Sequence, residues 1–345
     1  MVHRLLLFFL FVGFSLRTTA QTPDAEGNLV KWMTLQEALE KNSKQPRPII
    51  LDFYTDWCGW CKHMMKTTYA NPGIAQYINT NFYPAKFNAE GKDTIEFLGK
   101  KYLPSGPEPK APHELAVELL KGQLMYPSTL FLNGYEPEKN AFRLNMLAPG
   151  YLDAQKIEPI LVYTLENAFR NASIDDFRDQ YQKAFYDSTV EQTSRTLPWI
   201  DARSFFNNPN DGKKKSLVFI NTEWCNSCKV MGRASFSWDS LRTYLLDKFN
   251  LVGFNAESKD TMLYQGKAYP GGKQFHSLLP VLGKNGFAIP MLCVLDEQGQ
   301  LLDAIPSYVS PWFLRDIAHF YGDDFYRKGS WVEYQAVRYG KGSGQ

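Results

Sequence analysis

Short apolar runs alternate with amphipathic segments along the chain, a pattern that predicts a mixed α/β structure. Residues 49–54 form a nearly continuous apolar run, which is typical of a buried central strand. A helix is expected over 58–69, where an Asn-Pro pair at 71–72 stops it. A second strand is predicted over 82–87 and a second helix over 92–102.

A loop rich in proline and glycine follows at 103–112, after which the pattern resumes. We expect a short helix over 113–121, a strand over 128–132 that opens after Pro127, and a closing helix over 152–169. Apolar residues recur every three or four positions in the closing helix, which is the spacing of a helix that packs one face against a core.

The same pattern occurs twice, because the chain contains an internal repeat. Cys58 and Cys225 lie 225 − 58 = 167 positions apart, and this offset continues without a gap to about Tyr102. A four-residue difference then changes the offset to 163, at which Pro127 meets Pro290. A period this long indicates two duplicated domains rather than a solenoid.

We place the two copies at residues 30–170 and 197–327. A helical connector is expected between them at 171–196, because a capping-box-like start at Ser173 precedes aromatic residues spaced four apart. The tail at 328–345 ends in Gly and Ser and is predicted to be flexible.

The first twenty residues have the three-part pattern of a secretory signal peptide. His3 and Arg4 precede an apolar run at 5–16, and small residues follow up to Ala20. The run is shorter than the roughly 20 residues that cross a bilayer as a helix, so cleavage after Ala20 is favoured over an uncleaved anchor. We therefore expect a periplasmic or otherwise extracytoplasmic protein with no stable membrane span after cleavage, in a compartment where disulfides persist.

Composition and charge exclude several other classes of protein. A chain of 345 residues with 44% hydrophobic and 21% charged residues is ordinary for two globular domains. The formal net charge of +2 gives no electrostatic basis for binding nucleic acid. Five cysteines are too few for a disulfide-dense scaffold, but four of them form two Cys-x-x-Cys (CxxC) pairs.

Each CxxC pair stands where an expected strand gives way to an expected helix. The first reads Trp57-Cys58-Gly59-Trp60-Cys61-Lys62, and the second reads Trp224-Cys225-Asn226-Ser227-Cys228-Lys229. Unpaired N–H groups and the helix dipole favour negative charge there, so the thiolate of Cys58 should form at unusually low pH. That thiolate is the species that attacks a disulfide, and Cys61 is placed to resolve the resulting mixed disulfide.

Three other interpretations of the pairs remain. A structural disulfide that closes a four-residue loop would contribute at most about 2 kcal/mol. A shared zinc ion normally needs its second pair within about 20 residues, whereas 163 residues separate Cys61 from Cys225. Burial as small hydrophobic residues would not explain two copies at matching junctions. Redox chemistry is favoured for both pairs, and more strongly for the first.

Residues 51–62 resemble a thioredoxin-superfamily active site. Together with the segment at 68–74, they are most similar to the thioredoxin-like domain of the DsbD type of thiol:disulfide interchange protein. The resemblance covers about 30–170 and again about 197–327. It implies an α/β fold of two tandem thioredoxin-like three-layer domains joined by the connector, each with its CxxC pair at the N-terminus of a helix.

The resemblance also implies a surface that binds substrate. Pro127 would be the family's cis-proline beside the cysteines, where backbone groups are presented to an extended peptide, and Pro290 matches it in the second copy. An ordinary trans proline at the start of a strand is the alternative. The expected substrate-binding residues are Trp57, Gly59, Trp60, Tyr126, Pro127, Trp224, Ile289 and Pro290.

A pair of residues that handles protons is predicted in the first copy alone. Asp52 stands where thioredoxins carry a buried carboxylate, and Lys86 lies in the strand that supplies its lysine partner. Burial would raise the pKa of this carboxyl and suit it to take the proton from Cys61, whereas a solvent-facing Asp is the alternative. Phe219 and Gly253 occupy the two positions in the second copy, so we expect the first copy to be the more active.

These features predict an extracytoplasmic thiol:disulfide oxidoreductase that exchanges disulfides with protein substrates. No glycine-rich phosphate loop is present, so no organic cofactor is implied and a partner redox protein must donate or accept the electrons. The main alternative is a peptide-binding or chaperone-like module with oxidised or inactive pairs, and metal transfer is a third. The expected catalytic residues are Cys58, Cys61, Asp52, Lys86, Cys225 and Cys228.

Overall fold

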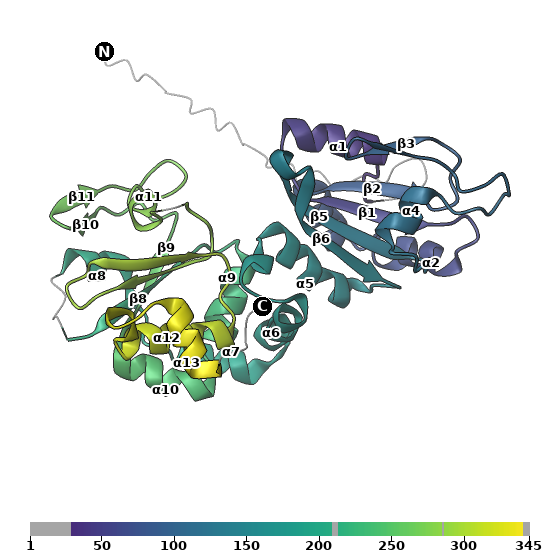
Figure 1. Cartoon of the computed structure of the whole chain (residues 1–345). Coiled ribbons are helices and arrows are strands. Elements are labelled where there is room, and N and C mark those ends of the chain that lie inside the picture. The colour runs from purple at the N-terminus through teal and green to yellow at the C-terminus, as the bar shows by residue number, and fades with distance from the viewer. Residues whose placement is uncertain (1–28, 209–212, 285, 341–345) are drawn as a thin grey trace, which may run out of the picture.

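The computed structural model describes residues 29–208, 213–284 and 286–340. These residues form two α/β domains with a helical segment between them (Figure 1). The expected signal peptide at 1–20 lies outside the described residues.

The first domain is a four-stranded sheet covered by helices on both faces. The strand order is β2-β1-β5-β6, and the central strand β1 runs parallel to β2 and antiparallel to β5. One face packs against α1 and α4, and the other against α2, α3 and α5. The elements are α1 (Leu35–Lys44), β1 (Ile49–Tyr54), α2 (Gly59–Thr67), α3 (Pro72–Asn81), β2 (Tyr83–Asn88), α4 (Glu114–Leu119), β5 (Ser128–Glu136), η1 (Pro137–Lys139), β6 (Ala141–Pro149) and α5 (Ala154–Leu165).

The second domain repeats this architecture with one additional short strand. Its strand order is β13-β12-β8-β9-β7, with α8 and α11 packed on one face and α9, α10 and α12 on the other. The elements are β7 (Ile200–Asp201), α8 (Ala202–Asn207), β8 (Lys215–Asn221), α9 (Asn226–Val230), the π-helical turn η3 (Met231–Ser235), α10 (Asp239–Lys248), β9 (Phe249–Asn255), α11 (Leu279–Leu282), β12 (Met291–Leu295), β13 (Leu301–Pro306), α12 (Pro311–Gly322) and η4 (Phe325–Arg327).

The structure confirms the internal repeat. An offset of 167 carries β1 at 49–54 onto 216–221, which lie within β8, and carries β2 at 83–88 onto 250–255, which lie within β9. The additional strand β7 also has a counterpart, because Met33 forms an isolated parallel bridge with Ala85 at the equivalent edge of the first sheet. Two tandem α/β domains of one design are therefore present.

The helix predicted over 92–102 is wrong. This segment forms a hairpin of β3 (Ile95–Phe97) and β4 (Lys100–Tyr102), and the second copy forms the same hairpin with β10 (Met262–Tyr264) and β11 (Lys267–Tyr269). The cause is the turn, because Leu98 and Gly99 have φ values of 50° and 77°. Two consecutive residues with positive φ make the tight turn that joins twisted antiparallel strands.

Several helices were not anticipated, among them α1, α3 and α13 (Trp331–Tyr339). Asn71 does not only end the preceding helix, because its side chain accepts hydrogen bonds from the N–H groups of Gly73 and Ile74 and so begins α3. In the tail, predicted to be flexible over 328–345, Ser330 and Glu333 form a capping box that begins α13. Tyr334 of this helix is buried in the core of the second domain.

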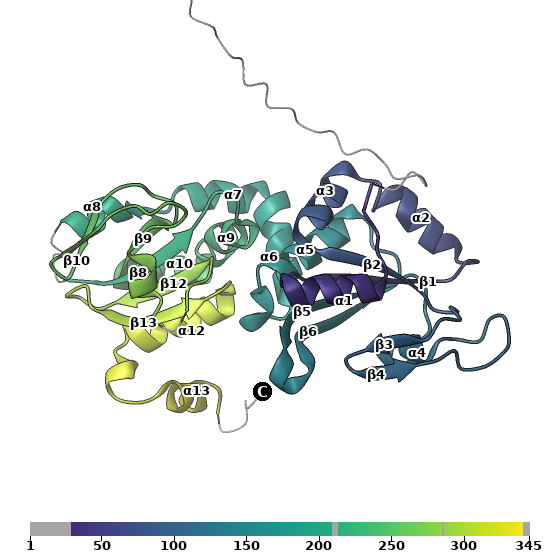
Figure 2. The same ribbon diagram turned by 90° about the horizontal axis from the view of Figure 1, so that it is seen from above.

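The connector is helical, as predicted, and it packs onto the second domain. It contains α6 (Ile174–Tyr186) and α7 (Ser188–Arg195), with Ser173 capping α6, and η2 (Ala168–Arg170) precedes the connector at the end of the first domain. Phe177 of α6 is fully buried, and its ring lies 5.6 Å from that of Tyr163 in α5 and 5.0 Å from that of Tyr308 after β13. Figure 2 shows α5 and α6 between the two sheets. The connector thus joins the hydrophobic cores of the two domains.

Phe177→Ala is expected to destabilise the protein by about 3–5 kcal/mol, because it leaves a cavity between aromatic rings of both domains. Urea denaturation measures this loss. Tyr186→Ala on the same helix is the matched control and should cost less than about 1 kcal/mol, since this ring is 52% exposed. Equal losses in the two variants would contradict the packing described here.

Candidate functional site

The first CxxC pair lies at the beginning of α2, four residues after β1 ends. Cys58 is the N-cap residue of the helix, and the N–H group of Cys61 donates to its Sγ over 3.0 Å. The two cysteines form a disulfide. Their residues are only 4% and 6% exposed, but Gly59 and Trp60 between them are exposed. The pair therefore sits just beneath the surface, at the strand-to-helix junction that the sequence predicts.

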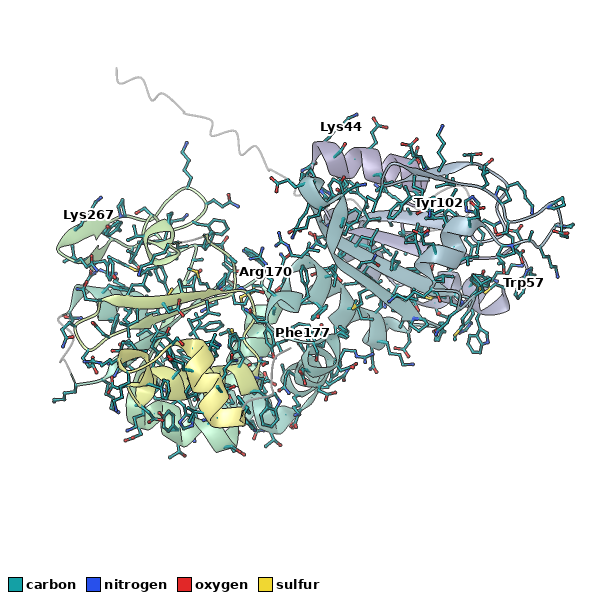
Figure 3. The ribbon with its side chains drawn as sticks, in the orientation of Figure 1. Lys44, Trp57, Tyr102, Arg170, Phe177 and Lys267 are labelled. Carbon is teal, nitrogen blue, oxygen red and sulfur yellow. A yellow bond between two sulfur atoms is a disulfide. The ribbon has the colours of Figure 1, made fainter. Side chains whose placement is uncertain are left out.

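Aromatic and apolar side chains surround this pair. Trp57 and Trp60 are 56% and 61% exposed, and Met125 is 51% exposed beside Tyr126. The indole N–H group of Trp57 donates to the Glu90 carboxylate over 3.0 Å, which orients the ring toward Tyr126. Figure 3 shows Trp57 at the outer end of the first domain, where it points away from the rest of the protein. This apolar surface adjoins the cysteines.

The proline expected beside the first pair is present in the predicted conformation. The Tyr126–Pro127 peptide bond is cis, and the N–H group of Gly150 donates to the Pro127 carbonyl over 2.8 Å. Tyr151 follows Gly150, and its ring lies 5.5 Å from that of Trp60. Tyr151 thus adds an aromatic ring to the surface beside the first pair.

Asp52 is buried in the centre of β1, six residues before Cys58. It is 2% exposed, and burial raises its pKa to about 7, an effect that the positive charge of Lys86 opposes. Asp52 and Lys86 are register partners in the parallel strands β1 and β2. The Tyr69 hydroxyl donates to the Asp52 carboxylate over 3.3 Å. The expectation of a buried carboxyl is confirmed, whereas sequence reasoning missed Tyr69.

The second CxxC pair has the same local geometry. Cys225 is the N-cap residue of α9, its Sγ accepts from the N–H group of Cys228 over 3.1 Å, and the two cysteines form a disulfide. The Ile289–Pro290 bond is cis, and the N–H group of Ser307 donates to the Pro290 carbonyl over 2.8 Å. The cysteines, the cis-proline and its partner residue are thus repeated in both domains.

The surroundings of the second pair differ from those of the first. Phe219 replaces the buried carboxyl, and its ring packs 5.7 Å from that of Trp199 and 5.4 Å from that of Phe236. A cavity of about 340 Å³ is lined by Gly253 and Cys228, together with polar residues such as Asn221 and Lys229. An aromatic ring thus takes the place of the buried carboxyl in the second domain.

A carboxylate from the first domain instead reaches the second pair from outside. Glu166, at the C-terminal end of α5, accepts hydrogen bonds from the N–H groups of Asn226 over 3.1 Å and Ser227 over 2.7 Å, and from the Ser227 hydroxyl. The Sγ atom of Cys225 lies 3.4 Å from the same carboxylate. Sequence reasoning missed Glu166, because no local pattern links it to a motif 59 residues later.

The second pair faces the first domain rather than solvent. Cys225 and Ser227 are both 0% exposed. A groove of about 690 Å³ beside the pair is lined by Trp224 and Ile289 from the predicted substrate surface, and by Glu166 and Arg170 from the end of the first domain. Figure 3 places Arg170 between the domains and Trp57 at the far end of the first, so the two pairs do not meet.

Other candidate groups in the described residues carry no such arrangement. No cluster of three or more His, Cys, Asp or Glu side chains that could hold a metal ion occurs within 29–208, 213–284 and 286–340. Cys293 is a buried free thiol whose pKa is raised to about 12 by burial. Over the same residues, every helix is too short or too polar to cross a membrane.

Known proteins are similar to parts of the chain in sequence. Residues 19–104 match the family model Thioredox_DsbH, described as a protein of unknown function, DUF255. The thiol:disulfide interchange protein DsbD of Pectobacterium atrosepticum is 31% identical over 61 residues, which are 18% of this chain and 11% of the relative. The DsbD protein of Vibrio vulnificus is 36% identical over 66 residues, with the same shares of each chain.

Known structures are similar in fold. The match to a thioredoxin-fold protein from Helicobacter pylori spans 46% of this chain and 92% of that protein's chain. The identity is 15% and the TM-score is 0.32. Each of the two described domains carries a CxxC disulfide at the N-terminus of a helix and a cis-proline. Together with the sequence matches, this arrangement supports thiol:disulfide exchange as the chemistry to be proposed. The chain matches about a tenth of the length of these curated relatives.

Asp52→Asn is expected to stabilise the folded chain at neutral and alkaline pH. Between the ordinary carboxyl pKa of 3.8 and the raised value of about 7, the unfolded chain loses a proton that the folded chain keeps. Stability therefore falls as the pH rises through this window. Above pH 7 the buried carboxylate costs about 4 kcal/mol, which the variant avoids. Urea denaturation at pH 4 and pH 8 measures the difference, which should be small at pH 4.

Asp56→Asn is the control, because this carboxyl lies four residues later and is exposed. Its effect on stability should be the same at both pH values. The account of Asp52 is wrong if the Asp52→Asn variant is no more stable than the wild type at pH 8.

Proposed function

We propose that this protein is an extracytoplasmic thiol:disulfide oxidoreductase that acts on protein substrates, with the first CxxC pair as its main catalytic site. One observation carries the proposal: the Cys58–Cys61 disulfide lies at the beginning of α2, in the domain that also contains the cis bond before Pro127 and the buried carboxyl of Asp52. This arrangement supports Cys58 as the attacking sulfur, Cys61 as the resolving sulfur and Asp52 as the proton acceptor.

The exchange reaction follows from this arrangement. The Cys58 thiolate attacks one sulfur of a substrate disulfide, forms a mixed disulfide and releases the other substrate sulfur as a thiolate. Cys61 then gives its proton to Asp52 and attacks the Cys58 sulfur, which forms the Cys58–Cys61 disulfide and releases the second substrate thiolate. Two electrons pass to the substrate. A partner dithiol protein must then supply two electrons to reduce the Cys58–Cys61 disulfide again. Run backwards, the same steps oxidise a substrate dithiol.

The surface beside Cys58 favours an extended, partly apolar polypeptide as substrate. Trp57, Trp60 and Met125 are all more than half exposed around the pair. Backbone groups next to a cis-proline can bind a peptide as an added strand, whatever its sequence. Apolar side chains that flank a substrate cysteine would bury this aromatic surface, which supports protein thiols and disulfides as the substrates.

The compartment and the relative activity of the domains are part of the same proposal. The signal-peptide pattern at 1–20 supports a periplasmic or otherwise extracytoplasmic location, where structural disulfides persist. In the second domain an aromatic ring takes the place of the buried carboxyl and a carboxylate lies in front of the pair, which supports a lower activity. Lys86 assists in the first domain as the positive charge that opposes the rise in the Asp52 pKa.

Cys58→Ser is expected to lower reduction of insulin disulfides at least about a hundredfold, because it removes the attacking sulfur. Cys225→Ser is the matched variant in the other domain and should keep activity within about twofold of the wild type. Precipitation of the insulin B chain with dithiothreitol as donor measures both. The opposite result for the two variants would overturn the assignment, and a wild-type protein that does not accelerate the reaction would be a peptide-binding module instead.

Asp52→Asn is expected to slow the second step of the exchange. In the wild type, the rate at which a mixed disulfide on Cys58 is resolved should rise with pH through about 7, as Asp52 becomes able to accept a proton. The Asn variant should lose this rise and be at least about tenfold slower at pH 7.5. Stopped-flow release of a thiol from a preformed mixed disulfide measures the rate. An unchanged pH profile in the variant would exclude Asp52 as the proton acceptor.

A further inference from the structure

At the second CxxC pair, the Glu166 carboxylate lies at the N-terminus of the helix, where the thiolate of Cys225 would otherwise be the negative charge. Its carboxylate accepts from the N–H groups of Asn226 and Ser227, the first two residues of α9. The N–H groups and the dipole of a helix N-terminus stabilise negative charge. Here Glu166 uses two of these N–H groups, while the Cys225 Sγ accepts from the N–H group of Cys228. At the first pair the equivalent residues, Gly59 and Trp60, are exposed.

The segment that follows Glu166 is held against the other side of the second site. The Ser307 hydroxyl donates to the Asn167 carbonyl over 2.7 Å, and the Asn171 amide donates to the Pro306 carbonyl over 2.8 Å. Ser307 follows β13 with a φ of 76°, where the first domain has Gly150 with a φ of 83°. Residues 165–171 therefore contact both the helix that carries the second pair and the loop beside its cis-proline.

We propose that residues 165–171 are an intramolecular plug on the second site, in which Glu166 keeps reduced Cys225 in its thiol form and out of reach of protein substrates. The residues of the plug are positioning residues, since they act by changing the environment of Cys225. The plug goes beyond the proposed function, because it explains how a complete CxxC pair can have low activity in the folded chain.

The charges around Glu166 are consistent with this arrangement. Burial raises the pKa of its carboxyl, an effect that the Ser227 and Asn226 hydrogen bonds and the positive charge of Lys229 on α9 oppose. Tyr77 on α3 and Tyr181 on α6 also face the carboxylate. An ionised Glu166 beside Cys225 would repel a thiolate there, since like charges disfavour each other's formation.

The same contact could in principle assist Cys225, with Glu166 as a base in place of the missing Asp52 equivalent. The two roles have opposite consequences for the thiol. A base would make Cys225 more reactive, whereas a plug that uses two of the helix N–H groups makes it less reactive. The geometry favours the plug, because Cys225 is 0% exposed and the Glu166 carboxylate lies 3.4 Å from its Sγ, where its negative charge would oppose a thiolate.

Glu166→Gln tests the proposal, because Gln keeps an acceptor oxygen and removes the charge. The background is the full chain with Cys58→Ser, Cys61→Ser and Cys228→Ser, in which buried Cys293 is the other remaining thiol. In the Glu166→Gln variant, iodoacetamide should alkylate Cys225 about tenfold faster at pH 7. The pH profile of this alkylation should move about one unit lower. Glu158→Gln on the same helix is the control and should leave the profile unchanged, since Glu158 accepts from Tyr186 instead.

An unchanged profile in Glu166→Gln, or one moved to higher pH, would overturn the proposal. A second measurement needs no substitution at Glu166. In the oxidised wild type under limiting dithiothreitol, differential alkylation and mass spectrometry should find the Cys58–Cys61 disulfide opened at least about fivefold faster than Cys225–Cys228. Equal or reversed rates would also contradict the plug. Neither readout uses insulin turnover, so failure here is distinct from failure of the proposed function.

Discussion

Both CxxC pairs depend on the N–H groups at the beginning of a helix, which have no acceptor within the helix itself. In each domain a buried central strand ends a few residues before a cysteine that caps the next helix, so the sulfur accepts from the helix backbone. Whatever lies in front of these donors decides the chemistry of the sulfur. At α2 the front is a surface of exposed tryptophans, and at α9 it is a carboxylate from the other domain. One local geometry thus supports two different electrostatic states.

The two copies differ at two positions that are paired in the sheet. Asp52 and Lys86 are register partners in the first sheet, and Phe219 and Gly253 are register partners in the second. An isolated carboxyl or lysine would be costly in that apolar region, so loss of one favours loss of the other. Phe219 packs against neighbouring aromatic rings instead of holding a proton. The second domain has aromatic core packing where the first has a carboxyl whose pKa burial raises to about 7.

Much of the fold could be predicted from local patterns, and the failures have physical causes. The strand at Ile49–Tyr54 and the helix after Cys58 follow from a buried apolar run and a following amphipathic segment. The residues around Leu98-Gly99 have a helix-like composition, so the hairpin there was missed. The positive φ values of these two residues make a turn instead of a helix. Asp52 could be found from its apolar neighbours. Glu166 could not, since its partners at α9 are brought to it only when the domains pack.

The contact between Glu166 and α9 also determines what a fragment of this protein would be. A second domain that begins at residue 197 would contain both cysteines, the cis-proline and the whole sheet, yet it would lack α5, the connector helix and the carboxylate. Phe177 and Tyr181 would be removed from its core as well. Such a fragment would present a bare helix terminus and an open apolar face, so its redox behaviour would describe a molecule with a different electrostatic environment from the intact chain.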